Sequence, residues 1–147
     1  MGIIKAFKPN IITPEEANLI KKDLNINVKL HLGAPAFDHP VVKKIIGVIN
    51  DTVKVNWNPP AYIRHESRIR NHGWHRDTGS NDHMLWCTYG ASVVLDPSEE
   101  AGYLEYREEG GILPAKDHYC GLAIHRSDVE HQTVHSGERN TFLCFTK

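Results

Sequence analysis

The stretch Pro59-Pro60-Ala61-Tyr62-Ile63-Arg64-His65-Glu66-Ser67-Arg68-Ile69-Arg70 marks the point where the chain changes from a helical to a strand-forming pattern. After it, short runs of β-branched and aromatic residues alternate with clusters of Gly, Asn, Asp and Ser, which is typical of strands and turns. Seven or more such strands in about 85 residues must close into a barrel or form two facing sheets. The expected strands cover about residues 61–70, 73–77, 85–95, 102–107, 120–125, 130–135 and 139–146.

Before that stretch the pattern is helical. Thr13-Pro14-Glu15-Glu16 offers a capping hydroxyl, a Pro at the first helical position and a Glu three residues after the cap, so we predict a helix over residues 14–24. A second helix is expected from Asp38 or His39, with Pro40 in its first turn. Its buried stripe would be Val41, Val42, Ile45, Ile46 and Ile49. A short strand is expected around Ile3, Ile4 and Phe7.

Helices followed by strands favour an α+β fold over an alternating parallel one. The 147 residues correspond to one domain, with residues 1–58 as mainly helical support and residues 59–147 as the strand core. Charged residues make up 24% and hydrophobic residues 40%, as in an ordinary globular protein. The net charge of −1 gives no general attraction to nucleic acid or membrane, so we expect neither as a partner.

The cysteines indicate a reducing compartment. Their number is odd and their spacing matches no zinc motif, so we interpret them as reduced thiols and expect a cytoplasmic location. They are Cys87, Cys120 and Cys144.

One group of residues has the composition of a metal site. His75 and Asp77 are two apart, a spacing that places both side chains on one side of a strand. With the distant His131 they offer two imidazoles and a carboxylate, which occupy one face of a metal and leave other positions open. We therefore predict that His75, Asp77 and His131 bind a metal. A zinc hydrolase remains an alternative, although His131 lacks the adjacent Glu of a His-Glu-x-x-His helix.

The order and spacing of four segments resemble the iron(II)/2-oxoglutarate-dependent oxygenases, the prolyl-4-hydroxylase-like branch most of all. The resemblance implies a double-stranded β-helix (a cupin-like jelly roll) with the N-terminal helices packed on one sheet. It also implies Fe(II), 2-oxoglutarate and O₂, and a dioxygenase that hydroxylates a C–H bond. The segments are Gly73-Trp74-His75-Arg76-Asp77, Ala91-Ser92-Val93-Val94-Leu95-Asp96, Gly102-Tyr103-Leu104-Glu105-Tyr106, and the run from Gly121 through His131 to Arg139.

Arg139 matches the basic residue that closes the family's pattern. A guanidinium offers a bidentate, permanently charged partner for the far carboxylate of 2-oxoglutarate. The alternative is a surface arginine paired with Glu138 or Glu130. Two departures affect the other contacts, since His65 and Val93-Val94 stand where the branch often has tyrosines. Tyr62, Tyr89 and Thr133 are the candidate replacements.

The expected substrate is a prolyl residue in a peptide or protein, with a small molecule as an alternative. A nucleobase-demethylating oxygenase is the second enzyme candidate, but the second Arg of its closing motif is absent after Arg139. A non-catalytic cupin-like module that binds a metal or small acid also remains open. Residues 78–83 are interpreted as a lid or as a plain connector.

Three further groups of residues are expected to lie outside the site. Arg64, Arg68 and Arg70 share a strand face with Glu66, and a solvated outer face is the favoured interpretation over a grip on an acidic substrate. His72 is expected on the surface. His135 is expected to face the side of His131 or the turn that follows, without binding the metal.

Overall fold

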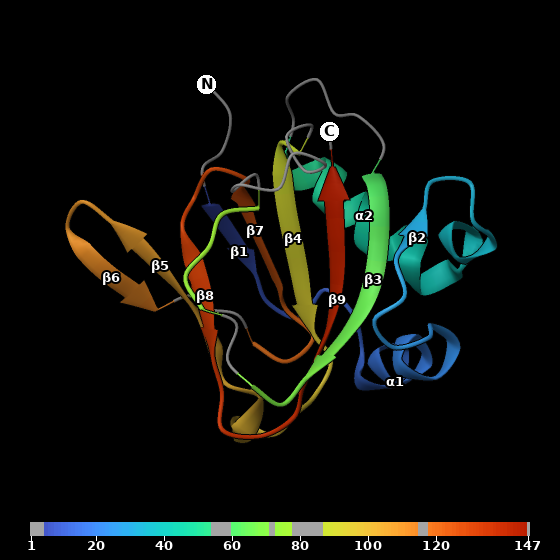
Figure 1. Cartoon of the computed structure of the whole chain (residues 1–147). Coiled ribbons are helices and arrows are strands. Elements are labelled where there is room, and N and C mark those ends of the chain that lie inside the picture. The colour runs from blue at the N-terminus through green and yellow to red at the C-terminus, as the bar shows by residue number, and fades with distance from the viewer. Residues whose placement is uncertain (1–4, 54–59, 71–72, 78–86, 115–117, 147) are drawn as a thin grey trace.

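The computed structural model describes residues 5–53, 60–70, 73–77, 87–114 and 118–146 (Figure 1). Two helices precede most of the strands, and the chain then continues as strands and turns, as predicted. The helical elements are α1 (Pro14–Asp23), η1 (Pro35–Asp38), α2 (Pro40–Thr52) and η3 (Glu99–Ala101). The strands are β1 (Lys5–Lys8), β2 (Leu30–His31), β3 (Pro60–Arg68), β4 (Tyr89–Val94), β5 (Tyr103–Glu108), β6 (Gly111–Pro114), β7 (Leu122–Arg126), β8 (His131–Val134) and β9 (Arg139–Thr146).

These strands form two antiparallel sheets. The larger has six strands in the order β1-β7-β4-β9-β3-β2, and the smaller has three in the order β6-β5-β8 (Figure 1). The predicted strand over residues 73–77 is reduced to one antiparallel bridge, which joins His75 to His131 on β8. Residues 85–86 of the predicted third strand lie outside the described part of the chain.

Helix α1 begins where the sequence predicts, and α2 begins at Pro40, within two residues of the predicted start. The Thr13 hydroxyl accepts the Glu16 N–H at 3.1 Å, and the Glu16 carboxylate accepts the Thr13 N–H at 2.9 Å, which completes the capping box of α1. At the start of α2, the His39 side chain accepts the Val41 N–H at 3.2 Å, and Pro40 is the first helical residue.

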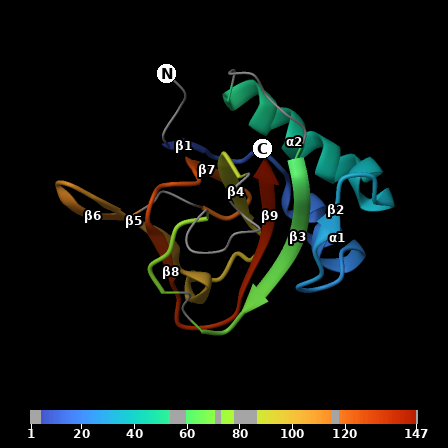
Figure 2. The same ribbon diagram turned by 45° about the horizontal axis from the view of Figure 1, so that its top comes forward.

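The helices cover one face of the six-stranded sheet, on the side away from β5, β6 and β8 (Figure 2). Ile20, Ile45 and Ile49 from the helices are fully buried there. Burial of one such side chain contributes about 1.5–3 kcal/mol, so this layer supplies much of the driving force for folding. Ile46, which was also expected in the buried stripe, is only partly covered. Alternate strand residues complete the core, including Ile63, Val93, Ile124 and Phe142.

The opposite face of β3 lines a cavity, which corrects one prediction from the sequence. Arg64, Glu66 and Arg68 line this cavity instead of forming a solvated outer face. The reason is the alternation of the strand, because His65 packs toward the helices and its ring contacts the Leu24 carbonyl at 3.1 Å. Arg70, just after the strand, is exposed.

Two short strands escaped prediction. The four residues of β6 are all exposed, so they show no alternation of buried and polar positions. Strand β6 is the return arm of the hairpin that it makes with β5. The second missed strand, β2, has only two residues. In the part of the chain that the structure describes, neither helix is long and apolar enough to cross a bilayer.

Candidate metal centre

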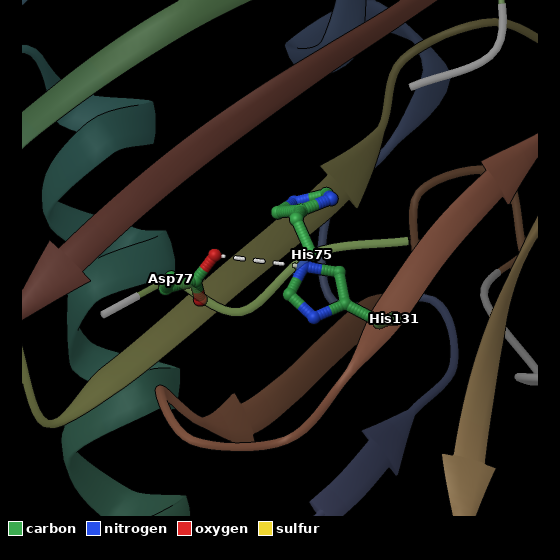
Figure 3. A group of neighbouring side chains, drawn as sticks. All are labelled: His75, Asp77 and His131. Carbon is green, nitrogen blue, oxygen red and sulfur yellow. Dashed lines mark ion pairs between the residues drawn. The ribbon is translucent and has the colours of Figure 1, made fainter. Parts of the chain in front are cut away.

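The structure brings His75, Asp77 and His131 together at the cavity (Figure 3). One potential ligand atom from each residue lies within 4.8 Å of the other two. The Asp77 Oδ1 atom is 3.5 Å from the His131 Nε2 atom, and the two histidine ring centroids are 4.3 Å apart. Two nitrogens and one carboxylate oxygen thus converge on a volume that one cation would fill.

Backbone pairing sets this convergence. His75 and His131 exchange two N–H···O bonds of 2.9 Å each, which fixes the segment that carries Asp77 against β8. Each ring also has its Nδ1 atom beside a carbonyl two residues earlier, at 2.7 Å for His75 and 2.9 Å for His131. A carbonyl only accepts hydrogen bonds, so each Nδ1 carries the proton and each Nε2 offers its lone pair.

The protonation states of His131 and Asp77 favour the binding of a cation. Burial, together with neighbouring imidazoles, lowers the pKa of His131 to about 3, so this ring is neutral at physiological pH. Burial alone would raise the pKa of Asp77, but the hydrogen bond from His125 and three nearby imidazoles lower it below its ordinary value. A neutral imidazole and an ionised carboxylate are the forms that bind metal, and His131 and Asp77 have these forms before a metal arrives.

A residue that was not singled out from the sequence completes the cluster. His125 on β7 is 5% exposed, and its Nε2 atom lies 2.9 Å from Asp77 Oδ2. Its Nδ1 atom lies 3.0 Å from the hydroxyl of Tyr106 on β5. The available signal was a single polar side chain in the apolar run Leu122-Ala123-Ile124-His125.

Arg139 lies on the wall of the same cavity, as the first residue of β9. It is 3% exposed, and its guanidinium donates to the Ala101 carbonyl at 2.8 Å. The alternative of a surface arginine is therefore wrong. Glu130, one of the partners considered for that alternative, contacts the Arg107 guanidinium at 2.5 Å instead.

The three predicted replacements for the missing tyrosines differ in position. Tyr62 and Thr133 line the cavity. Burial raises the pKa of Tyr62 to about 12, so its hydroxyl stays protonated. Tyr89 is not among the lining residues and packs in the core on the helix side, because its alternate neighbours Gly90 and Ser92 take the cavity side of β4. Tyr89 is thus a core residue.

Two hydroxyl groups of the cavity wall were not predicted. Ser92 on β4 is 7% exposed, and within the described part of the chain its hydroxyl has no hydrogen-bond partner. Thr141 on β9 is 3% exposed and also lines the cavity. A buried hydroxyl without a protein partner is costly unless water or a ligand satisfies it.

His135, which was considered beside the predicted ligands, is held at the turn that follows β8. The His135 ring lies between the Gly137 carbonyl at 2.7 Å and the Arg70 carbonyl at 3.0 Å, which ties it to the turn as one interpretation expected. His72 and the loop over residues 78–83 lie outside the described residues.

Sequence comparisons with family models and with curated proteins find no match. Among solved structures, a prolyl-4-hydroxylase from Pseudomonas putida matches with a TM-score of 0.69 and 13% identity over 97% of this chain and 84% of that one. A prolyl hydroxylase from Trichoplax adhaerens, in complex with a hypoxia-inducible-factor peptide fragment, matches with a TM-score of 0.70 and 11% identity. The match covers 97% of this chain and 83% of that one. The viral collagen prolyl hydroxylase of Paramecium bursaria Chlorella virus 1, in complex with 2-oxoglutarate, matches with a TM-score of 0.65 and 14% identity. The match covers 97% of this chain and 95% of that one. The chain therefore has the fold of these three prolyl hydroxylases.

Proposed function

We propose that the protein is an Fe(II)- and 2-oxoglutarate-dependent dioxygenase that hydroxylates a C–H bond. The observation that carries the proposal is the convergence of His75, Asp77 and His131 on one point of a cavity whose wall also contains Arg139. The likeness in fold to solved oxygenases supports it. We also infer that the two sheets are the halves of a double-stranded β-helix.

The three side chains would hold iron through His75 Nε2, Asp77 Oδ1 and His131 Nε2. Such a set occupies one face of the metal, so positions remain for the 2-oxo acid and for O₂. When bound, Fe(II) supplies the oxidative decarboxylation of 2-oxoglutarate and the hydroxylation that is coupled to it. The chain contributes fixed ligands, the protonation states described above and a largely buried site.

Arg139 would hold the far carboxylate of 2-oxoglutarate through its charged fork. The hydroxyls of Ser92 and Thr141, together with Tyr62 and Thr133, are the partners that the cavity wall offers to the rest of the molecule. They would replace the tyrosines that the prolyl-hydroxylase-like branch often uses, because His65 lies on the opposite face of β3.

We propose a prolyl residue in a peptide or protein as the substrate. The support is the likeness to three prolyl hydroxylases, one of them bound to a peptide. Arg64 and Arg68 bring two positive charges to the cavity wall, and Glu66 between them brings only one negative charge. An acidic residue near the target proline would therefore fit this wall.

The test is an anaerobic titration of the protein with Fe(II) and 2-oxoglutarate, followed by exposure to O₂. We expect a weak visible metal-to-ligand band and then succinate. His131→Ala should show neither, whereas His118→Ala, which changes an exposed histidine, should behave as the wild type. A colourless wild-type protein that retains zinc and forms no succinate would instead favour a hydrolase or a binding module.

A further inference from the structure

We propose that His125 is a positioning residue that holds Asp77 as a one-oxygen metal ligand, with the Tyr106 hydroxyl as its anchor. The inference rests on the metal site of the proposed function and assigns a role to a residue outside the predicted ligand set. The two carboxylate oxygens of Asp77 face different partners. Oδ2 lies 2.9 Å from His125 Nε2, and Oδ1 lies 3.5 Å from His131 Nε2.

Hydrogen bonds occupy both nitrogens of the His125 ring. The Asp77 carboxylate is ionised and accepts, so His125 Nε2 must carry a proton and donate it. His125 Nδ1 lies 3.0 Å from the Tyr106 hydroxyl, which can donate or accept and therefore satisfies this nitrogen. Both ring nitrogens are used, so His125 has no lone pair left for a metal.

The hydrogen bond from His125 occupies Asp77 Oδ2, so Oδ1 is the oxygen that faces His75 and His131. Because Oδ2 is held by His125, the carboxylate cannot turn to place both oxygens on one cation. Binding through one oxygen keeps a coordination position open for the 2-oxo acid and O₂. Outer partners of this kind typically change metal affinity or activity by about 10–100-fold when removed.

Strand β4 leaves space for the contact between Asp77 and His125 because residue 90 is a glycine. A Cβ atom built on Gly90 of β4 would lie 2.2 Å from Asp77 Oδ2 and 3.2 Å from His125 Nε2. Any side chain at position 90 would therefore push the two groups apart. Gly90 does not adopt a positive φ, so the need for glycine here arises from space and not from backbone conformation.

The arrangement is not explained by packing alone. The adjacent residues Ala123 and Ile124 are fully buried and apolar, and an apolar side chain at position 125 would fill the same volume. A buried imidazole is costly unless its polar atoms are satisfied. Tyr106 and Asp77 satisfy both nitrogens, and Tyr106 itself is 1% exposed and packs against Phe7.

The experiment measures the affinity for Co(II) by anaerobic competition with a chelator and records the visible spectrum of the Co(II) protein. His125→Phe removes the donor, His125→Gln keeps an amide N–H for Asp77, and Gly90→Ala crowds the contact while His125 stays. His118→Phe is the matched control on the surface. Thermal melting of each apo protein checks the fold.

We expect His125→Phe and Gly90→Ala to weaken Co(II) binding by about 10–100-fold and to change the Co(II) spectrum. His125→Gln should recover most of the affinity, and His118→Phe should match the wild type. Wild-type affinity and spectrum in both His125→Phe and Gly90→Ala would overturn the inference while the proposed function stands. A wild-type protein that binds no Co(II) or Fe(II) would overturn the proposed function itself. If His125→Phe fails to fold, Gly90→Ala and His125→Gln decide the question.

Discussion

Single side chains at this site have their hydrogen-bonding roles fixed by the protein. The rings of His75 and His131 donate through Nδ1 to carbonyls of their own segments, so their Nε2 atoms are the only nitrogens left to bind a cation. The motif His75-x-Asp77 together with His131 made this trio predictable. His125 was not predictable in the same way, because a histidine in an apolar strand has no fixed spacing to a partner that approaches from another strand.

Arg139→Gln tests the cosubstrate site at this scale. The amide keeps two polar atoms but loses the charge, and hydrogen bonds to charged groups contribute about 1.5–3 kcal/mol. We therefore expect the KM for 2-oxoglutarate to rise by about 10–100-fold, while Fe(II) affinity changes little. Succinate formation at varied 2-oxoglutarate measures the effect, and Arg70→Gln, which changes an exposed arginine, is the control. An unchanged KM in Arg139→Gln would remove this arginine from the site.

The three free cysteines should be unreactive in the native protein. Burial raises the pKa of Cys87 to about 12 and also raises the pKa values of Cys120 and Cys144, so none is a thiolate at pH 8. A thiol-disulfide reagent should modify none of them at pH 8 and all three in denaturant. These pKa values are higher in the folded protein than in the unfolded chain. The three thiols therefore contribute fully to the free energy of unfolding below the ordinary thiol pKa, and this contribution is lost as the pH rises above that value. A thiol that reacts rapidly in the folded protein would contradict this account.

Among the elements, β3 shows the limit of sequence reasoning most clearly. The alternation of its side chains was predictable. Which of its two faces points to the cavity depends on the sheet that β3 forms with a strand later in the sequence, β9. Ile63 and His65 contact the helix layer, so Arg64, Glu66 and Arg68 face the cavity. The capping box of α1 and the prolines of both helices, by contrast, are local signals, and they placed the helix starts to within one or two residues.

Glu66→Gln tests the charge row on β3. The carboxylate of Glu66 lies 2.6 Å from Arg64 Nη2 and 2.9 Å from Arg68 Nε. Its loss leaves two neighbouring cations without their shared partner, so we expect the free energy of unfolding to fall by about 1–3 kcal/mol. Urea denaturation measures this change, with the exposed Glu99→Gln as the control. Equal stability of Glu66→Gln and wild type would show that solvent already compensates the two arginines.

On the scale of the whole molecule, the two sheets bring together ligands that lie far apart in the chain. The bridge between His75 and His131 ties the segment before Asp77 to the small sheet, and the helix layer supports the large sheet from behind (Figures 1 and 2). The α+β class was predictable from the order of helices and strands, and the packing of the helices on one sheet was what the resemblance to the oxygenases implied. The extent of each sheet was not predictable, because β2 and β6 are too short or too exposed to show a periodic pattern.

Ile45→Ala tests the role of the helix layer. Ile45 is fully buried against the sheet, and truncation of such a residue costs about 2–5 kcal/mol. We expect a lower melting temperature, with Fe(II) affinity preserved at temperatures where the variant is folded. Leu19→Ala on α1, where the side chain is 42% exposed, should cost much less. Loss of metal binding in a folded Ile45→Ala protein would show that the helices do more than support the sheet.

The most direct measurement is anomalous diffraction from crystals grown with Mn(II) in place of Fe(II) and with 2-oxoglutarate. We predict one strong peak at about 2.0–2.3 Å from His75 Nε2, Asp77 Oδ1 and His131 Nε2. Density for the acid should extend from that peak to the Arg139 guanidinium. A peak that lacks any of these three ligands, or an acid bound away from Arg139, would contradict the account.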